Sequence, residues 1–561
     1  MKVTKCDCLL RAGAAGISLT LLLMLTACGM GPAAPAGNPA VPVDGPAEIA
    51  RPAALVRGDL PYGEMPYEHY DPAAFASLLK PIERASLFGT AQQTFDSACE
   101  AAEKELRYMA TLSVQMEIAR SATPNDTEVT EESAYIDGVY RDAYNDFLSA
   151  LGRVASSSHS GLLESRYTEE ERALFLTFVG SGTEEQSDDL YDREHTLELR
   201  YEELISADEV GYDAVCGLYV DLVELRREIA ADRGYDSYAA YAYETQYARQ
   251  YTPEEAETFC QAVKDTFAPL AQRSREQVYG QSAELYDSGR IDCSPAAILS
   301  ALGTGAAHFP TEVSEAYQYM MTYGLYNIDP GEGSLQTGYT ALLYAYNEPF
   351  IYNTPVGHYT DYSTLFHEFG HFVNYYCVGS DLLFRIADGD LSELQSQGME
   401  VMFFPYYKDF FGDDAAPLIR ADVLMGLIDA VVDGAMYDEF QQKVFAEPNL
   451  TPDRVQDIYR QVYTSYGYEP YDGFEEEWMD QIHNFQLPFY YISYATSAVS
   501  ALELCLVEQS DPAAALEDYI TVVKTDGERE GFTETLDRAG LRNPLSACRE
   551  IAQAVENSGL L

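Results

Sequence analysis

The chain has 561 residues, of which 47% are hydrophobic, so it is long enough to form two or more structural units around a large core. Its 91 acidic residues against 35 basic ones give a net charge of −56, which repels nucleic acid and anionic lipid headgroups. This charge excludes nucleic-acid binding, and the same field attracts cationic peptides.

The first residues predict an export signal that is not part of the fold. Basic residues precede a short apolar run over 12–24, and Leu-Thr-Ala-Cys follows at 25–28. This ending resembles a bacterial lipobox, so we expect a lipoprotein signal peptide over 1–27 and lipidation of Cys28. The alternative, a transmembrane anchor, needs ~20 apolar residues. We therefore expect an extracytoplasmic protein that meets the cell membrane only through its lipid anchor.

The next two parts of the chain differ in composition. Residues 28–61 are rich in Pro, Ala and Gly without periodicity, which is typical of a tether. Residues 62–200 show apolar positions three and four apart and predict an N-terminal helical lobe without a chemical motif. The clearest helical patterns cover 95–117, 131–155 and 168–178.

Residues 201–561 are expected to form the catalytic domain. After further helical pattern, two β-prone runs over 339–346 and 349–353 predict a small sheet. An edge strand of this sheet could pair with an extended peptide backbone. Gly357 and His358 follow the sheet and are candidates for contact with substrate, although the role of an ordinary loop residue is favoured for His358.

A metal-binding motif stands at 364–371, Thr-Leu-Phe-His-Glu-Phe-Gly-His. In H-E-x-x-H, His367 and His371 lie roughly 40° apart on a helix, so both imidazoles reach one ion. Glu368 is then placed to take a proton from a metal-activated water. Five letters of this kind also occur by chance, but the apolar residues around them favour a buried helix: Leu365, Phe366, Phe369, Phe372 and Val373.

A second helix supplies the candidate third ligand. Glu393 opens the run Glu-Leu-Gln-Ser-Gln-Gly-Met-Glu over 393–400, and a His2Glu set is a catalytic zinc site. Glu400 lies two turns further along the same face, where it can orient a ligand imidazole. A solvated acidic helix is the alternative. We expect one Zn²⁺ per chain, although this ligand set also accepts other divalent metals.

A third block, 482–495, contains His483 and three tyrosines at helical spacing of three and four: Tyr490, Tyr491 and Tyr494. The spacing predicts that these tyrosines share one face of a helix. Core packing is the ordinary role of such a stripe. Near zinc, a phenol can instead donate a hydrogen bond to the oxyanion of a tetrahedral intermediate.

Together, T-L-F-H-E-F-G-H, E-x-x-S-Q-x-x-E and H-x-F…P-F-Y-Y-x-x-Y-A resemble the thimet oligopeptidase and oligoendopeptidase F family of zinc peptidases. The resemblance implies that His367, His371 and Glu393 bind zinc and that Glu368 is the general base. It also implies that the third block faces substrate, with His483 and either Tyr491 or Tyr494 as catalytic groups and Tyr490 as a substrate contact. Ser497 departs from the Gly of some relatives.

The fold implied by this family is mainly α and zincin-like, with two lobes, a deep substrate channel and a small β-sheet next to the zinc helix. The implied function is a zinc metalloendopeptidase that hydrolyses short or unfolded peptides outside the cytoplasm. Oligopeptides are its expected partners, and no protein partner is indicated. A lipid-anchored peptide-binding protein on a zincin scaffold is the alternative, and a structural surface protein is a third class.

Overall fold

The structure is a computed structural model that describes residues 57–178, 184–205, 210–286, 290–329, 331, 333–380 and 386–560. The predicted signal peptide, the lipidation site Cys28 and the tether before residue 57 lie outside the described residues. Among those described, no helix combines the length and the apolar character that crossing a bilayer requires.

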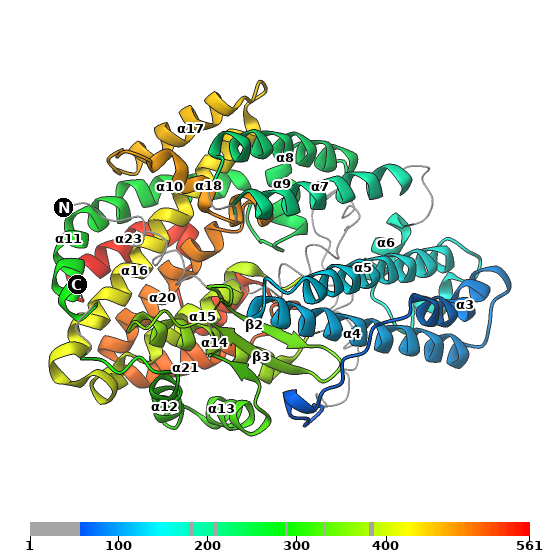
Figure 1. Cartoon of the computed structure of the whole chain (residues 1–561), viewed down its shortest axis with the longest axis horizontal. Helices are drawn as coiled ribbons and strands as arrows, with labels where there is room; N and C mark the ends of the chain where they lie inside the picture. Colours follow the sequence, from blue (N-terminus) through cyan, green and yellow to red (C-terminus); the bar gives the residue numbers. More distant parts are fainter. Residues whose placement is uncertain are drawn as a thin grey trace.

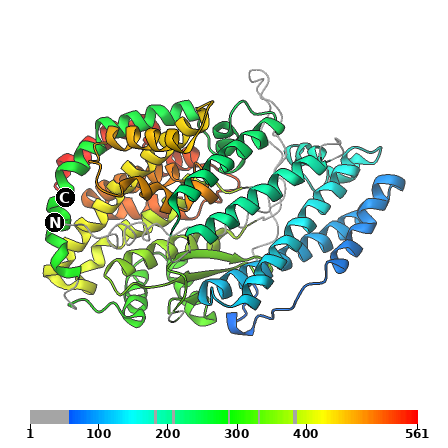
Figure 2. The same ribbon diagram turned by 45° about the horizontal axis from the view of Figure 1, so that its top comes forward.

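Four helices form the N-terminal part: α3 (Pro72–Phe88), α4 (Gln92–Ala122), α5 (Thr127–Ala155) and α6 (Glu169–Thr177). They occupy one end of the molecule in Figures 1 and 2 and pack on one another through their apolar faces. Side-chain caps fix where three of them begin, at Asp71, Asp126 and Thr168. The three helices that the periodicity predicts in this part are confirmed.

The next helices lead from this part to the sheet. They are α7 (Glu184–Ile205), α8 (Tyr212–Asp232), α9 (Tyr238–Thr245), α10 (Pro253–Asp265), α11 (Phe267–Tyr286), α12 (Pro295–Ala306) and α13 (Thr311–Tyr323). Thr252 and Glu255 form a reciprocal capping box at the start of α10. Helix α7 runs through residue 200 and packs against α8. The division of the chain at that residue stays a prediction.

The sheet has three strands, β1 (Tyr326–Asn327), β2 (Gly338–Leu343) and β3 (Glu348–Asn353), in the order β1-β3-β2. β1 is parallel to β3, and β2 is antiparallel to it. The predicted strand over 339–346 ends at Leu343, because the chain turns back through Asn347, whose φ of 51° is left-handed. This order leaves β2 at an edge, beside the helix that carries the metal motif (Figure 1).

Four helices form the centre of the C-terminal half: α14 (Thr360–Val378), α15 (Gly389–Met402), α16 (Tyr407–Ala446) and α20 (Ile492–Ser510). Helix α15 packs between α14 and α20, and α16 packs on α20. Around them lie α17 (Pro452–Ser465), α18 (Glu477–Asp480), α19 (His483–Gln486), α21 (Pro512–Val523), α22 (Phe532–Ala539) and α23 (Pro544–Ser558). Short 3₁₀ turns occur at Tyr62–Glu64, Ser160–Leu163, Phe404–Tyr406 and Phe474–Glu476.

The first described residues are fastened to this half of the molecule. The Arg57 guanidinium donates to the carbonyl oxygen of Tyr376 and lies 3.8 Å from the centre of that ring. The backbone N–H of Gly58 donates to the Tyr346 carbonyl at 2.8 Å, and that of Leu60 donates to Glu348 Oε1 at 3.1 Å. The chain therefore meets the folded body at the C-terminal end of α14.

The predicted fold class is confirmed, since the structure is mainly helical and has a small sheet next to the helix that carries the metal motif. The deep substrate channel stays a prediction.

Candidate metal centre and active site

Helix α14 brings the two histidines of the motif to one buried face. His367 and His371 are each 2% exposed, and their ring centres are 5.2 Å apart. The apolar side chains at neighbouring positions are fully buried, so the helix is held inside the protein and not at its surface. A buried helix of this kind fixes both imidazoles before any ligand binds.

Helix α15 adds the carboxylate of Glu393. Its Oε2 lies 3.4 Å from His367 Nε2 and 3.9 Å from His371 Nε2, and the three side chains form a buried group that could hold a metal ion. The two helices approach this closely because Gly370 faces α15: a Cβ at this position would lie 2.5 Å from the Gln395 carbonyl oxygen. Ligands about 2 Å from one ion in tetrahedral geometry lie roughly 3.3 Å apart, so these separations suit a shared cation.

The donor atoms of this group fit a divalent cation. Among the described residues, neither His367 Nε2 nor His371 Nε2 has a hydrogen-bond partner, although both atoms are buried. Buried polar atoms are almost always satisfied, so two such nitrogens facing one carboxylate require an explanation. Two imidazole nitrogens and one carboxylate oxygen match the ligand set of catalytic zinc.

A carboxylate outside the group orients one of the imidazoles. Glu400 Oε1 lies 2.9 Å from His367 Nδ1, as the seven-residue spacing from Glu393 predicts. A carboxylate accepts a proton and does not donate one, so the Nδ1 atom carries the hydrogen and Nε2 presents its lone pair. His371 Nδ1 is 3.5 Å from Ser392 Oγ, a weaker contact.

Burial affects the two histidines differently. It lowers the pKa of His371 to about 4. Burial also acts to lower the pKa of His367, but the neighbouring carboxylates of Glu393 and Glu400 outweigh it and raise that pKa well above its usual range. Metal binding requires the Nε2 atom of His367 to be free of a proton, so it competes with protonation of this ring.

Glu368 is fully buried on the same helix, and its two carboxylate oxygens differ. Oε2 accepts a hydrogen bond of 2.8 Å from Thr340 Oγ1 on strand β2. Oε1 has no partner among the residues described here. Burial raises the pKa of Glu368 to about 7, which suits a group that takes and returns a proton near neutral pH. Thr340 belongs to no sequence motif, so its contact with Glu368 is a feature of the site that the sequence does not predict.

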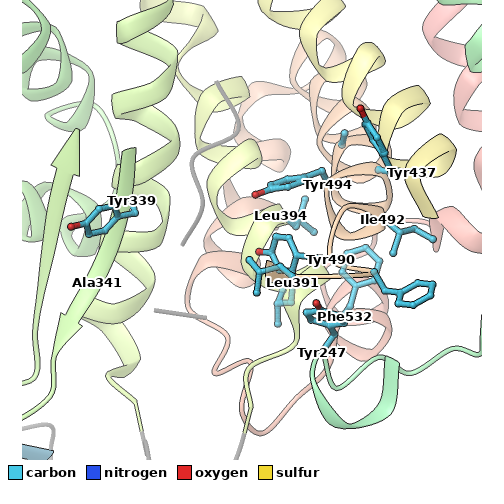
Figure 3. Packing of buried hydrophobic residues seen from close by; sticks show 14 of the residues in the cluster. Tyr247, Tyr339, Ala341, Leu391, Leu394, Tyr437, Tyr490, Ile492, Tyr494 and Phe532 are labelled. Carbon is cyan, nitrogen blue, oxygen red and sulfur yellow. The ribbon is translucent and has the colours of Figure 1, made fainter. Parts of the chain in front are cut away.

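The third block lies on the other side of α15. Figure 3 shows Tyr490 and Tyr494 next to each other with their hydroxyls pointing the same way. Tyr490 donates its hydroxyl hydrogen to Glu393 Oε1, so in the structure it holds a candidate metal ligand. Its expected contact with substrate stays a prediction.

The three tyrosines lie at the start of helix α20, and the rings of Tyr490 and Tyr491 are each 5.3 Å from the ring of Tyr494. Helix α20 begins only at Ile492, and the chain before it turns sharply at Phe489, whose φ is 69°. Tyr490 and Tyr491 lie in this turn, and Tyr494 lies in the first turn of the helix. The spacing thus predicted that these side chains lie together, but Tyr490 and Tyr491 precede the helix.

His483 is in the buried helix α19 and reaches the same tyrosines. Its Nε2 atom is 3.4 Å from the Tyr494 hydroxyl, and its ring centre is 5.0 Å from that of Tyr491. The structure thus brings together His483, Tyr491 and Tyr494. Tyr494 and His483 are also close enough to the metal group for the charge of Glu393 to affect their pKa values.

The predicted loop residues lie just before the metal helix. Asp361 Oδ2 accepts from the backbone N–H groups of Gly357 and His358 at 2.9 and 3.0 Å. Gly357 has a φ of 83°, which permits this tight loop. The bonds fix the loop to the first turn of α14, and a role of either residue in substrate binding stays a prediction.

Residues 307–552 match the model of a family described as Peptidase family M3. This range contains the metal group, Glu368 and the third block. A search of curated proteins finds no match to the chain.

Solved structures match over most of the chain. An X-ray structure of a candidate oligoendopeptidase F has a TM-score of 0.75 and 21% identity, covering 89% of this chain and 98% of that one. PZ peptidase A with an inhibitor has a TM-score of 0.75 and 19% identity, covering 88% and 98%. A candidate oligoendopeptidase F from Bacillus anthracis has a TM-score of 0.71 and 18% identity, covering 89% and 98%. At these identities the likeness shows a shared fold.

Proposed function

We propose that this chain, a metalloendopeptidase that carries a peptidase family M3 domain, hydrolyses short or unfolded peptides with Zn²⁺ as its metal and Glu368 as its general base. One observation carries the proposal: two buried imidazole nitrogens without hydrogen-bond partners among the described residues face the Glu393 carboxylate. The neighbouring Glu368 Oε1 is buried and unpartnered in the same way.

His367, His371 and Glu393 would hold the metal. When bound, Zn²⁺ supplies a Lewis acid that polarises the peptide carbonyl and lowers the pKa of water. Glu400 keeps the lone pair of His367 directed at the ion, and Tyr490 holds the outer oxygen of Glu393. These outer contacts fix the ligands in advance, which reduces the reorganisation that metal binding requires.

Glu368 would move the proton. Thr340 fixes its Oε2, so Oε1 is the oxygen available to take a proton from water as that water attacks the scissile carbonyl carbon. The same oxygen then returns the proton to the leaving amine nitrogen. A pKa of about 7 makes both transfers feasible near neutral pH.

The carbonyl oxygen of the peptide would be stabilised by a group formed by His483, Tyr491 and Tyr494. As that oxygen becomes an oxyanion, a hydroxyl hydrogen from this group stabilises it in a buried environment. Strand β2 supplies an edge beside Glu368 to which an extended peptide backbone can bind. Such backbone pairing gives affinity with little side-chain selectivity, which suits an enzyme that hydrolyses short peptides of different sequence.

We further propose that the enzyme acts outside the cytoplasm, anchored through lipid on Cys28. The support is the sequence of residues 1–28, with its basic start, apolar run and Leu-Thr-Ala-Cys ending. Metabolic labelling with a fatty-acid analogue, compared between the native chain and Cys28→Ser, tests this placement. Equal labelling of both would contradict it.

The catalytic proposal is tested by joining metal content to activity. The chain from residue 29 onward is purified, its zinc is quantified, and cleavage of a quenched peptide of about ten residues is compared with that of a folded protein. Glu368→Gln is the matched control, because it keeps the shape of the side chain and removes its base. We expect one zinc per chain in both proteins, peptide cleavage only in the unmodified one, and an intact folded protein. Absence of zinc, or full activity of Glu368→Gln, would overturn the proposal.

A further inference from the structure

One polar side chain near the site has no role in the mechanism above. Gln481 lies between α18 and α19, and its amide bridges two catalytic candidates. The Oε1 atom is 2.9 Å from His483 Nδ1, and the Nε2 atom donates to the Tyr491 hydroxyl at 2.9 Å. The two ends of one amide therefore contact a histidine and a tyrosine of the same block.

The carbonyl end of the amide fixes the proton of the histidine. Burial lowers the pKa of His483 to about 4, so its ring is neutral near pH 7 and carries a single N–H. A carbonyl oxygen can only accept, so that hydrogen must be on Nδ1. The Nε2 atom then presents its lone pair to the Tyr494 hydroxyl, 3.4 Å away. In this state His483 accepts a hydrogen bond on that side and cannot donate one.

The amino end of the amide acts on the tyrosine. An amide N–H donates, so the Tyr491 oxygen accepts and its own hydrogen is not used by Gln481. The other two phenols of the block differ: Tyr490 donates to Glu393, and Tyr494 faces the lone pair of His483. Tyr490 and Tyr494 are each 1% exposed, whereas Tyr491 is only partly buried.

We propose that Gln481 is a positioning residue whose amide holds the His483 proton on Nδ1 and leaves the Tyr491 hydroxyl hydrogen free to donate to the carbonyl oxygen of a bound peptide. This inference rests on the proposed peptidase function and assigns the oxyanion donor within it. The amide polarity decides the assignment. With the amide reversed, Tyr491 would donate to Gln481, and His483 would become the donor through Nε2.

The first experiment reads the position of the proton directly. Long-range nitrogen–hydrogen NMR spectra of the metal-free protein with ¹⁵N-labelled histidine distinguish a protonated Nδ1 from a protonated Nε2. His483→Gln identifies the resonances of this ring. We expect the hydrogen on Nδ1 in the native chain and a mixture of both tautomers in Gln481→Met. A hydrogen on Nε2 in the native chain would overturn the assignment, whether or not the protein cleaves peptides.

The second experiment tests whether Gln481 acts through Tyr491. In Gln481→Glu the carboxylate accepts from both neighbours, so it binds the Tyr491 hydrogen and removes the donor. We expect a loss of about a hundredfold in kcat, similar to that of Tyr491→Phe, with KM changed by less than about twofold. In a protein that already carries Tyr491→Phe, adding Gln481→Glu should lower kcat by less than a further factor of about three.

The matched control is Gln486→Met. Gln486 is in helix α19 with His483, and its amide donates to Glu202 at 2.7 Å and not to the tyrosines. Its kcat should equal that of the native chain. An equal loss from Gln481→Glu in the native and Tyr491→Phe backgrounds would indicate a structural role only and would overturn the proposal. A kcat of Tyr491→Phe equal to that of the native chain would also overturn the proposal. Failure of the peptidase function itself would show as inactivity of the native chain, with the NMR result unaffected.

Discussion

The two ligand imidazoles are oriented unequally, and this difference has a measurable consequence. The carboxyl group of Glu400 lies 2.9 Å from His367 Nδ1, whereas the hydroxyl of Ser392 is 3.5 Å from His371 Nδ1. Charge-assisted hydrogen bonds of normal length are stronger than long neutral ones. The first contact should therefore contribute far more to metal affinity than the second.

We predict that Glu400→Ala weakens zinc binding by about ten- to a hundredfold, because His367 loses the group that directs its lone pair. The measurement is zinc retention in competition with a chelator of known affinity. Ser392→Ala is the comparison and should change retention by less than about threefold. Equal losses of zinc affinity in the two variants would show that Glu400 and Ser392 orient their imidazoles equally well, which would contradict the prediction.

Thr340 affects the pKa of Glu368, the proposed general base. Its hydroxyl donates to the charged form of Glu368 and so lowers the pKa that burial raises. Since the base must be a carboxylate to accept a proton, kcat/KM should rise with pH through the pKa of Glu368. A cation bound nearby favours the carboxylate, so we place this acid limb at or below about pH 7.

Thr340→Val has nearly the same shape and β-branching but donates no hydrogen bond. We predict that the acid limb of its pH profile moves to higher pH, with activity at alkaline pH largely kept. The measurement is kcat/KM from about pH 5 to 9 with zinc content checked at each point, because protonation of His367 releases metal at low pH. A shift of the acid limb to lower pH would show that the Thr340 hydroxyl does not stabilise the carboxylate form of Glu368.

What could be predicted at this scale depended on sequence spacing. His367 and His371 follow from one turn of helix, and Glu400 follows from two turns after Glu393. Thr340 and Gln481 could not be predicted, because common polar residues gain their roles only through contacts that the fold creates. The hydroxyl of Tyr490 meets Glu393 across 97 positions of sequence, a pairing that no local pattern contains.

At the scale of elements, the site depends on how closely two helices approach. Gly370 on α14 faces the backbone of α15, and a Cβ there would be 2.5 Å from the Gln395 carbonyl oxygen and 2.6 Å from Ser396 Cα. Backbone atoms cannot turn aside as a flexible side chain can. Any larger residue must therefore move α15, and Glu393 moves with it.

We predict that Gly370→Ala lowers the free energy of unfolding by about 3 kcal/mol and reduces zinc affinity as well. Gly426→Ala in α16 is the control, since its added Cβ has no atom within 4 Å and the site is exposed. Helix propensity should make that change neutral or stabilising by up to about 1 kcal/mol. Urea unfolding and zinc titration of both variants provide the measurement. If Gly370→Ala binds zinc as tightly as the native chain, the metal site does not depend on the close approach of α14 and α15.

The elements themselves were largely predictable, and their ends were not. Periodicity predicted α14, α15 and the two main strands, because each has a strong apolar pattern. It did not predict where α20 begins, because Tyr490 and Tyr491 match helical spacing but precede the helix. Arg249 donates to the carbonyl oxygen of Phe489 and to the hydroxyl of Ser493, and these buried bonds stabilise the turn. The partner is 240 residues away in sequence, so local pattern could not reveal it.

At the scale of the whole molecule, the charge of −56 should select among substrates. A field of this size raises the local concentration of cationic peptides and lowers that of anionic ones. We predict that a basic peptide has a higher kcat/KM than an acidic peptide with the same residues around the cleaved bond. The ratio should fall as salt rises, because screening shortens the range of the field from about 30 Å at 0.01 M to about 3 Å at 1 M. A ratio independent of salt would indicate local contacts instead.

The attachment of Arg57 to Tyr376 also has a mechanical consequence. A pull on the backbone at this point loads the C-terminal end of α14 and the turn before β3, because the contacts of Arg57, Gly58 and Leu60 all lie there. The helices of the N-terminal part are not on that path. Force along the chain would thus reach the helix with both histidine ligands first, and in an optical-trap experiment bound zinc should raise the force at which this segment yields.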